Sequence, residues 1–484
     1  QVPVVAVMTT GGGTRALTSL LGNLLGLQKL GLLDAILYIT GSSGSTWTLA
    51  HLYQSADWSH KDLSGPIQEI RRHMTKSKLS CFSLESLKYY SQELKLRKQE
   101  GYQISSIERS LGFALSLFLV NSQKNNHKLS DERQALNQGQ NPLPIYMILN
   151  IKEDYSLSEF KEWVEFTPYE VGFLKYGAFI RAEDFGSEFF MGRLMKKLPE
   201  SRICFMKGEV IPWETLDSRK MCLIYTFPKY SNKTDEPSLP ARDHELETYL
   251  ITPECGIMGI VREVLTERVM VSKFCNFLKG FQMHNEYLQS KNLRIWKDTV
   301  LENFPNQLTE TAEFLCLADT AGYIDISYPP LMRPERKVDV VLHLNYSSGS
   351  QTSPLEEASK YFSKQGIPFP KIHLSEEEKK NLKECYIFED AGTPEAPTVV
   401  FFPLVNDTFR KYKEPGVERS PAEMAQGNVD VSGPFSPYCI NSFTYTEEQF
   451  DKLVKLTSYN IQNNKELILQ ALNSAIAQKR QPKK

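Results

Sequence analysis

The chain has 484 residues, of which 41% are hydrophobic and 24% are charged, as is usual for a globular protein. Its formal net charge of -2 provides no overall positive field, which argues against nucleic acid as a partner. The eight cysteines include no C-x-x-C pair, and no cluster of carboxylates resembles an ion site. We therefore predict neither a disulfide scaffold nor a metal centre.

The longest apolar run, Leu111 to Val120, is much shorter than the roughly 20 residues that cross a bilayer. It therefore predicts a buried helix segment rather than a membrane anchor. The chain opens directly on an apolar strand, Val2 to Met8, with no signal peptide before it. We expect this chain to be a fragment of a longer protein, and cytoplasmic.

The opening of the chain alternates between strand and helix patterns. In chain order the elements are a strand at Val4–Met8, a turn at Thr9–Gly13, a helix with an apolar face (Leu17, Leu20, Leu21, Leu24, Leu25), a strand at Ile36–Ile39, a turn at Gly41–Ser45 and a helix at Thr46–Tyr53. This order predicts two parallel strands joined by a right-handed crossover.

Further along the chain the pattern is mixed. We expect helices over 60–140, a strand at Pro142–Asn150, an aromatic and glycine-rich stretch at Trp163–Gly192, strands at Phe314–Ala318, Val338–Leu344 and Thr398–Phe402, and helices from Glu447 to Ala477. Residues 207–262 are irregular and polar, so we predict a mobile loop, lid or cap there. The whole indicates an α/β fold.

The first glycine turn, Gly11 to Ala16, fits the dinucleotide pattern G-x-G-x-x-A between a strand and a helix. That pattern requires an acidic residue at the end of the second strand to bind the ribose. This strand ends at Gly41 without a carboxylate, and Asp34 lies at its other end. Because no G-x-x-x-x-G-K-[ST] motif is present either, we predict no nucleotide site.

The second turn centres on Ser43 between Gly41 and Ser45. A serine on a sharp strand-to-helix turn is typical of a nucleophile elbow, which exposes the hydroxyl at a helix N-terminus. The alternative is that Ser42, Ser43 and Ser45 only cap a helix. Ser45 stands where the second glycine of G-x-S-x-G is usual, so this turn alone decides nothing.

The two turns together favour acyl transfer. Both follow parallel strands, so we expect Gly11–Gly13 and Ser43 to lie side by side at the carboxyl edge of the sheet. Glycine allows backbone N–H groups to face an incoming carbonyl oxygen, as an oxyanion hole requires. Arg15 adds a positive charge suited to a phosphate-bearing substrate, its alternative role being a surface helix charge.

Asp319 is the best candidate for the base. It ends the apolar strand Phe314–Ala318, and a strand's carboxyl end positions it for the same crevice as Ser43. Its alternative role is that of a turn-former. His343 lies mid-strand and is expected to be structural, and His51 should point away from Ser43. A Ser-His-Asp hydrolase that recruits His343 or His373 stays the rival.

These residues resemble the cytosolic (group IV) phospholipase A2 family, which is related to patatin-type lipases. The similarity lies in Gly11-Gly-Gly-Thr-Arg15, in Gly41-Ser-Ser-Gly-Ser-Thr-Trp47, in Asp319, and in the segments Trp163–Glu170 and Phe185–Gly192. It implies a single catalytic domain over 1–484, with a three-layer fold in which helices flank a mostly parallel mixed sheet. It also implies Ser43 as nucleophile, Asp319 as base, Gly12 and Gly13 as oxyanion donors, and Arg15 as the phosphate contact.

The resemblance implies release of the sn-2 fatty acid from membrane glycerophospholipids, with lysophospholipase or transacylase activity beside it. Two alternatives stay open. The same dyad could pass the acyl chain to the nitrogen of phosphatidylethanolamine, as a calcium-stimulated N-acyltransferase. More remotely, the chain could be a lipid-binding scaffold without catalysis.

The resemblance also implies partners. Many members carry an upstream calcium-dependent membrane-binding module, so we expect Ca²⁺ to act on membrane docking and no cofactor in this domain. We expect reversible, peripheral membrane association. The basic residues Lys479, Arg480, Lys483 and Lys484 could touch anionic lipid, at about 1 kcal/mol each, or form a solvated end.

Overall fold

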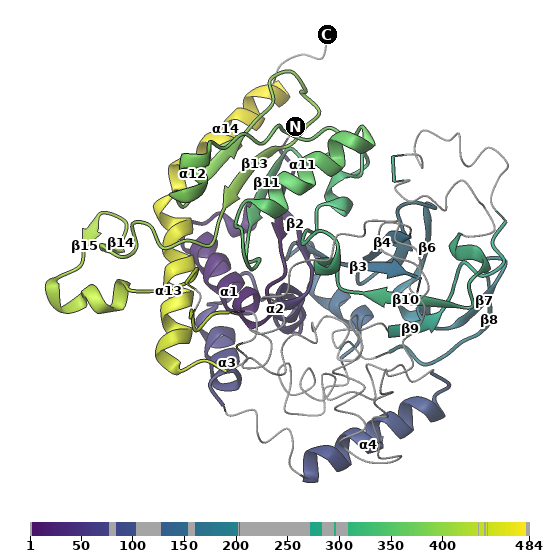
Figure 1. Cartoon of the computed structure of the whole chain (residues 1–484). Helices are drawn as coiled ribbons and strands as arrows, with labels where there is room; N and C mark the ends of the chain where they lie inside the picture. The colour runs from purple at the N-terminus through teal and green to yellow at the C-terminus, as the bar shows by residue number, and fades with distance from the viewer. Residues whose placement is uncertain are drawn as a thin grey trace, which may run out of the picture.

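The computed structural model describes residues 2–76, 84–102, 127–152, 160–201, 203, 272–282, 295–296, 308–433, 435–439, 442 and 444–480. Within them, helices lie on both faces of a central sheet (Figure 1). The region 207–262 and the apolar run at 111–120 lie outside the described residues, and so do Lys483 and Lys484.

The main sheet combines parallel and antiparallel strands. Its strands are β1 (Val5–Thr9), β2 (Ile36–Gly41), β3 (Leu143–Ile151), β4 (Lys161–Phe166), β5 (Glu170–Phe173), β6 (Ala178–Arg181), β9 (Ser272–Cys275), β10 (Phe314–Ala318), β11 (Val340–Leu344), β12 (Tyr386–Phe388) and β13 (Thr398–Phe402). The main path runs β12-β13-β11-β1-β2-β3-β4-β5-β6. Strands β13 through β3 along this path pair in parallel, whereas β12 and β4 to β6 pair antiparallel with their neighbours.

The described residues form three hydrophobic clusters, and two of them lie on opposite faces of the sheet and explain its layers. Alternate side chains of a strand point to opposite faces, so Val5 and Val7 join one core whereas Ala6 and Met8 join the other. The first core is covered by α1 (Gly13–Lys29), α2 (Gly44–Leu52), α3 (Ser64–Met74), α13 (Glu447–Asn463) and α14 (Lys465–Arg480), and the second by α11 (Ser353–Gln365). The predicted three-layer α/β fold is thus confirmed.

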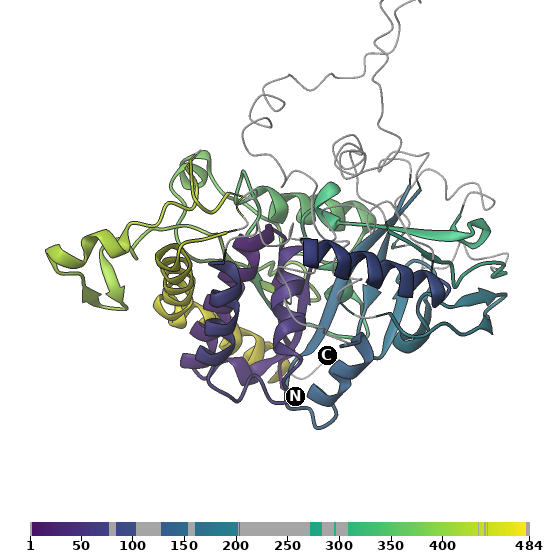
Figure 2. The ribbon, with the colours of Figure 1, turned by 90° about the horizontal axis from the view of Figure 1, so that it is seen from below.

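Helix α1, which begins at the glycine turn, packs closely on α13. Figure 2 shows the yellow α13 beside the purple N-terminal helices. A Cβ atom added to Gly22 would overlap the side chain of Thr457, and one added to Gly26 would lie 2.8 Å from Ile461 Cβ. These two glycines let the helix backbones approach, which fixes the axis of α1 and hence the turn before it.

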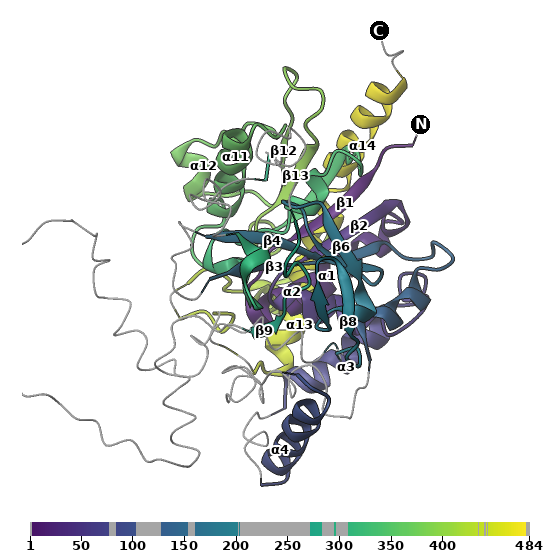
Figure 3. The same ribbon diagram turned by 90° about the vertical axis from the view of Figure 1, so that its right-hand side faces the viewer.

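The remaining elements lie outside these layers or join them. They are α4 (Leu84–Gln99), the hairpin β7 (Glu188–Phe190) and β8 (Arg193–Lys196), α12 (Glu376–Lys380), and the hairpin β14 (Tyr412–Glu414) and β15 (Val417–Glu418). The two chain ends lie together (Figure 3), where Lys479 Nζ donates to the carbonyl oxygen of Val2 at 3.2 Å.

Most predicted elements are confirmed, and one stretch differs. The strands Phe314–Ala318 and Thr398–Phe402 have the predicted bounds, and the predicted C-terminal helical region consists of α13 and α14. No element is assigned from the sequence to Trp163–Gly192, yet this stretch contributes to β4 and contains β5 to β7. The reason is that β4 is buried on both faces, charged residues included, so it lacks the alternation that reveals a strand.

Candidate active site

Ser43 occupies the turn between β2 and α2 in a strained backbone conformation, with φ 50° and ψ −134°. Such a conformation costs on the order of 1–3 kcal/mol in a non-glycine residue, and it persists where surrounding groups enforce it. Here Ser45 Oγ accepts the Ser42 N–H at 3.1 Å and lies 2.8 Å from Thr9 Oγ1. The chain therefore forms the strand-to-helix elbow that the sequence predicts, and the hydroxyl groups of Ser45 and Thr9 stabilise it.

The glycine turn packs directly on this elbow. A Cβ atom added to Gly44 would overlap the carbonyl oxygen of Gly13, and one added to Gly11 would lie 3.2 Å from Ser43 Oγ. Gly12 and Gly13 have φ of 141° and 59°, which favour glycine. Among the described residues, no hydrogen bond engages the N–H groups of Gly12 and Gly13. Within the described part of the chain, these two donors therefore lie beside Ser43 without an acceptor.

Asp319 approaches Ser43 by a different route from the predicted one. Along one edge of β3, residues 143–146 pair in parallel with β2, whereas residues 149–151 pair antiparallel with β10. Strands β2 and β10 therefore point toward each other along that edge. Ser43 follows one strand and Asp319 follows the other, so the two meet where the strands end. The convergence is as predicted, but it arises from strands that meet head to head.

The environment of Asp319 suits a base. Burial raises the pKa of Asp319 to about 7, although hydrogen bonds from the Ala321 N–H (3.0 Å) and from Ser43 lower it. The neighbouring carboxylate of Asp325 adds to the rise. An aspartate with a pKa near neutrality can both accept and return a proton at physiological pH, which an ordinary aspartate does poorly.

Aromatic and cationic side chains hold the segment that follows Asp319. The Lys161 ammonium lies 4.2 Å from the ring centroid of Tyr323, and the ring of Trp163 lies 6.1 Å from it. Trp163 Nε1 donates to the hydroxyl of Tyr361 on α11 at 3.0 Å. Side chains of β4 and α11 thus pack against the segment that follows Asp319.

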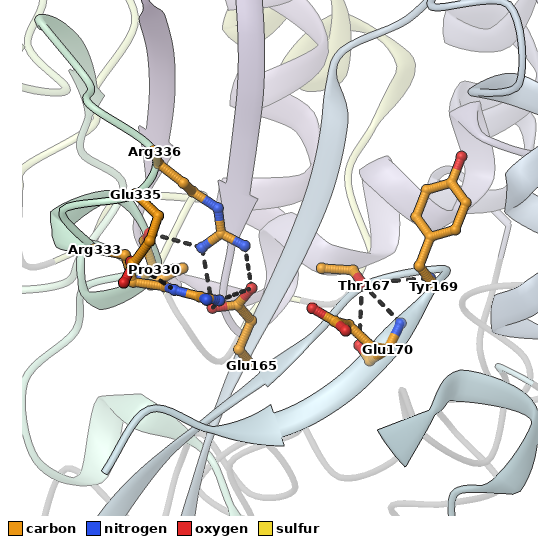
Figure 4. Close-up of polar contacts among 8 residues, drawn as sticks. All are labelled: Glu165, Thr167, Tyr169, Glu170, Pro330, Arg333, Glu335 and Arg336. Atoms are coloured by element: carbon orange, nitrogen blue, oxygen red, sulfur yellow. Dashed lines mark hydrogen bonds and ion pairs between the residues drawn. The ribbon is translucent and has the colours of Figure 1, made fainter. Parts of the chain in front are cut away.

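A buried ion cluster holds the same segment further along. Glu165 of β4 is fully buried and accepts from Arg336 Nη1 at 3.0 Å and from Arg333 Nη1 at 3.4 Å (Figure 4). Arg336 also donates to the carbonyl oxygen of Pro330 at 2.7 Å. Such a cluster is costly to break because an unpartnered charge would stay buried.

Arg15 lies inside the protein rather than on its surface. It is 5% exposed, and its Nε donates to the carbonyl oxygen of Tyr346 at 2.8 Å and its Nη1 to that of Tyr438 at 3.3 Å. Its Nη2 is buried and has no hydrogen-bond partner in the described part of the chain. The alternative role as a surface helix charge is therefore wrong.

The histidines considered as rival bases have other surroundings. His343 is fully buried, its Nδ1 lies 2.9 Å from the Tyr328 hydroxyl, and burial lowers its pKa to about 3. His51 Nε2 lies 3.3 Å from Glu69. None of the histidines in the described ranges influences the pKa of Asp319, whereas Ser43 does. No group of metal-ligating side chains is found among the described residues.

Asp325 is a site residue that the sequence analysis misses. Its Oδ1 accepts the Gly11 N–H at 2.6 Å, and its Oδ2 accepts the hydroxyl of Ser347. Burial raises its pKa, and the charge of Arg15 opposes that rise. A carboxyl between two buried isoleucines, Ile324 and Ile326, is the sequence signal that could have revealed it.

The sheet and the site define an α/β fold of the patatin-like class. The solved human GIVD cytosolic phospholipase A2 has this fold, with a TM-score of 0.86 and 43% identity over 99% of this chain and 63% of that one. A second structure, of human GIVD cytosolic phospholipase A2 in complex with methyl gamma-linolenyl fluorophosphonate, aligns with a TM-score of 0.75 and 39% identity over 99% of this chain and 60% of that one.

Sequence comparison agrees. Residues 5–211 match the family model described as the lysophospholipase catalytic domain. The chain is 52% identical to cytosolic phospholipase A2 epsilon of Homo sapiens over 100% of its own length and 57% of the relative's. It is 43% identical to the human delta form, over 98% and 59%. Over its whole length the chain is thus similar to cytosolic phospholipases A2, and it spans a little over half the length of these relatives.

Proposed function

We propose that the protein is a phospholipid acyl hydrolase that releases the sn-2 fatty acid through an acyl-Ser43 intermediate, with Asp319 as base. The observation that carries the proposal is the convergence of Ser43, on its strained elbow after β2, with Asp319 after β10, where burial raises the pKa of Asp319 to about 7. The names of the relatives, and the fluorophosphonate complex of one of them, support the same chemistry.

In the first half of the reaction, Asp319 takes the hydroxyl proton as Ser43 Oγ bonds to the ester carbonyl carbon. The carbonyl oxygen becomes an oxyanion and accepts from the N–H groups of Gly12 and Gly13. When the C–O bond to glycerol breaks, protonated Asp319 returns the proton to the leaving alkoxide. Lysophospholipid departs and the acyl chain stays on Ser43.

In the second half, Asp319 takes a proton from water as the water oxygen attacks the acyl carbon. The Ser43 C–O bond breaks, the proton returns to Ser43 Oγ, and the fatty acid leaves. An amine could replace water, and N-acylated phosphatidylethanolamine would then be the product. In both reactions Arg15 Nη2 would donate to the lipid phosphate, and Asp325, as a negative neighbour of the glycine turn, disfavours a nucleotide pyrophosphate there.

The proposal extends to the membrane surface. No helix in the described part of the chain is long and apolar enough to span a bilayer. We propose peripheral docking, with Ca²⁺ acting through a separate membrane-binding module. We also propose contact with anionic lipid through Lys479, Arg480, Lys483 and Lys484. Of these, Lys479 lies away from Ser43, because its Nζ pairs with Asp339 Oδ2 at 2.6 Å beside the start of β11.

The test is a product assay on mixed phosphatidylcholine and phosphatidylethanolamine vesicles with wild type, Ser43→Ala and Asp319→Ala. Fatty acid, lysophospholipid and N-acylated lipid are followed by mass spectrometry, with and without Ca²⁺. We expect activity in wild type only, and the product ratio identifies the acceptor. Near-normal activity of Asp319→Ala would refute the dyad, and a silent wild type would favour the lipid-binding scaffold.

A further inference from the structure

The carboxylate of Asp325 connects three parts of the site. Its Oδ1 accepts the N–H of Gly11, at the start of the glycine turn, at 2.6 Å. Its Oδ2 accepts the hydroxyl of Ser347, which follows β11. Asp325 itself lies on the segment that also carries Asp319. A hydrogen bond to a carboxylate is about twice as strong as one between neutral groups, so this contact can fix the turn.

The space around Gly11 shows how close these groups lie. A Cβ atom at Gly11 would lie 2.9 Å from Asp325 Oδ1, 2.7 Å from Ser43 Cβ and 3.2 Å from Ser43 Oγ. The carboxylate, the glycine turn and the nucleophile therefore border one small volume. A shift of the turn would be transmitted directly to the N–H groups of Gly12 and Gly13.

We infer that Asp325 is a positioning residue for the acyl transfer: by holding the Gly11 N–H, it aims the next two N–H groups of the turn at the acyl oxygen on Ser43. This inference rests on the proposed function of Ser43 as the nucleophile. It assigns the role to the acceptor oxygen of residue 325, which an asparagine would retain and an apolar residue would not.

The charge of Asp325 has a separate, measurable effect. The charged groups that act with Asp325 are Arg15 from α1 and Asp319 from its own segment, and Tyr445 and Cys439 in turn influence Arg15. Because the Asp325 charge raises the pKa of Asp319, a neutral residue would lower that pKa. The base would then become ionised, and the enzyme active, at a lower pH.

The experiment compares Asp325→Asn, Asp325→Leu and Ser347→Ala with wild type in the full chain. Two readouts are used: the rate at which an alkyl fluorophosphonate labels Ser43, and hydrolysis of a soluble p-nitrophenyl ester from pH 5 to 9. Thermal unfolding checks each fold. We expect Asp325→Leu to slow both rates at least about 100-fold, the loss typical of a displaced oxyanion donor. The rates of Asp325→Asn should stay within about 10-fold of wild type, and those of Ser347→Ala should fall less than those of Asp325→Leu. In the pH–rate profile of Asp325→Asn, the acid limb should shift to lower pH.

Folded Asp325→Leu with wild-type rates would overturn the inference, and so would Asp325→Asn as slow as Asp325→Leu. If Asp325→Leu does not fold, Asp325→Asn decides: near-normal rates with a shifted acid limb support the inference, and a loss of about 100-fold overturns it. A wild-type protein that the fluorophosphonate leaves unlabelled would refute the proposed function as well, which distinguishes the two failures.

Discussion

The two halves of the candidate site are built in opposite ways. The half with Ser43 lies on parallel strands, and its parts are close in sequence: β1, the glycine turn, α1, β2 and the elbow all fall within residues 5–52. The half with Asp319 depends on distant segments, since β10 pairs antiparallel with β3, and β4 and α11 hold the residues that follow.

This difference shows which contacts determine the positions of Ser43 and Asp319. The strained turn at Ser43 is held in place by the hydroxyl groups of Ser45 and Thr9. Asp319 is fixed by long-range contacts to Tyr323 and to the arginines that bind Glu165. Changes at the glycine turn and the elbow should therefore act on catalysis directly, whereas changes at the contacts that hold the Asp319 segment should act through stability.

Forcing the glycine turn and the Ser43 elbow apart should have the largest effect on activity. The Gly44→Ala methyl group would overlap the Gly13 carbonyl oxygen, so the elbow and the oxyanion donors must separate. We expect fatty-acid release to fall about 1000-fold. Gly65→Ala on α3 is the control, because a Cβ atom added there would have no heavy atom within 4 Å. Equal losses in both variants would contradict the direct coupling of the two turns.

Breaking the buried ion cluster should mainly reduce stability. Glu165→Ala leaves Arg336 and Arg333 without their carboxylate, at a cost of about 3 kcal/mol or more in the free energy of unfolding. Glu170→Ala, also shown in Figure 4 but on an exposed residue, should cost less than about 0.5 kcal/mol. Urea denaturation measures both, and similar values for the two variants would show that the cluster does not hold the Asp319 segment.

Helix packing in the first half provides the next test. Gly22→Ala gains about 1 kcal/mol in helix propensity, but its methyl group would overlap Thr457 of α13. We expect overpacking to prevail and destabilise the protein by about 1–3 kcal/mol. Asn473→Ala, on an exposed position of α14, is the control and should stabilise slightly. Stabilisation by Gly22→Ala in the same denaturation assay would show that α1 and α13 can separate freely.

The smallest expected effect concerns pH and stability. The folded pKa of Asp319, about 7, lies above its value in the unfolded chain, so the folded state binds the proton more tightly and loses stability as pH rises from about 4 to 7. Asp319→Asn lacks this loss and should be more stable than wild type at pH 8, and similar at pH 4. Ser43→Ala, which retains the carboxyl, should keep the wild-type slope. Equal stability of Asp319→Asn and wild type at pH 8 would mean that Asp319 is not strained by burial.

Sequence predicts the first half of the site well because its signals are local. The apolar strands, the glycine turn and the elbow around Ser43 follow one another, and parallel pairing brings them to one edge. Asp319 was identifiable as a carboxylate at a strand end, but the antiparallel pairing of β10 was not, since strand direction depends on segments far away in the chain.

Buried polar groups explain what the sequence does not predict. β4 hides Lys161, Glu162 and Glu165 in the interior, so its pattern lacks the apolar alternation of a strand. Asp325 likewise has no motif of its own, because its partners, Gly11 and Ser347, come from other parts of the fold. The burial of Arg15 is also invisible to sequence, since two backbone carbonyl groups from distant loops receive its N–H groups.

The measurement that tests the central claim most directly is the rate at which an alkyl fluorophosphonate captures Ser43, followed by intact-protein mass spectrometry from pH 5 to 9. Wild type and Asp319→Asn are compared, with His343→Gln as the control for a histidine base. We predict that the wild-type rate rises through an inflection near pH 7, that His343→Gln follows it, and that Asp319→Asn is slow and lacks the inflection. An inflection that persists in Asp319→Asn, or disappears in His343→Gln, would contradict the dyad.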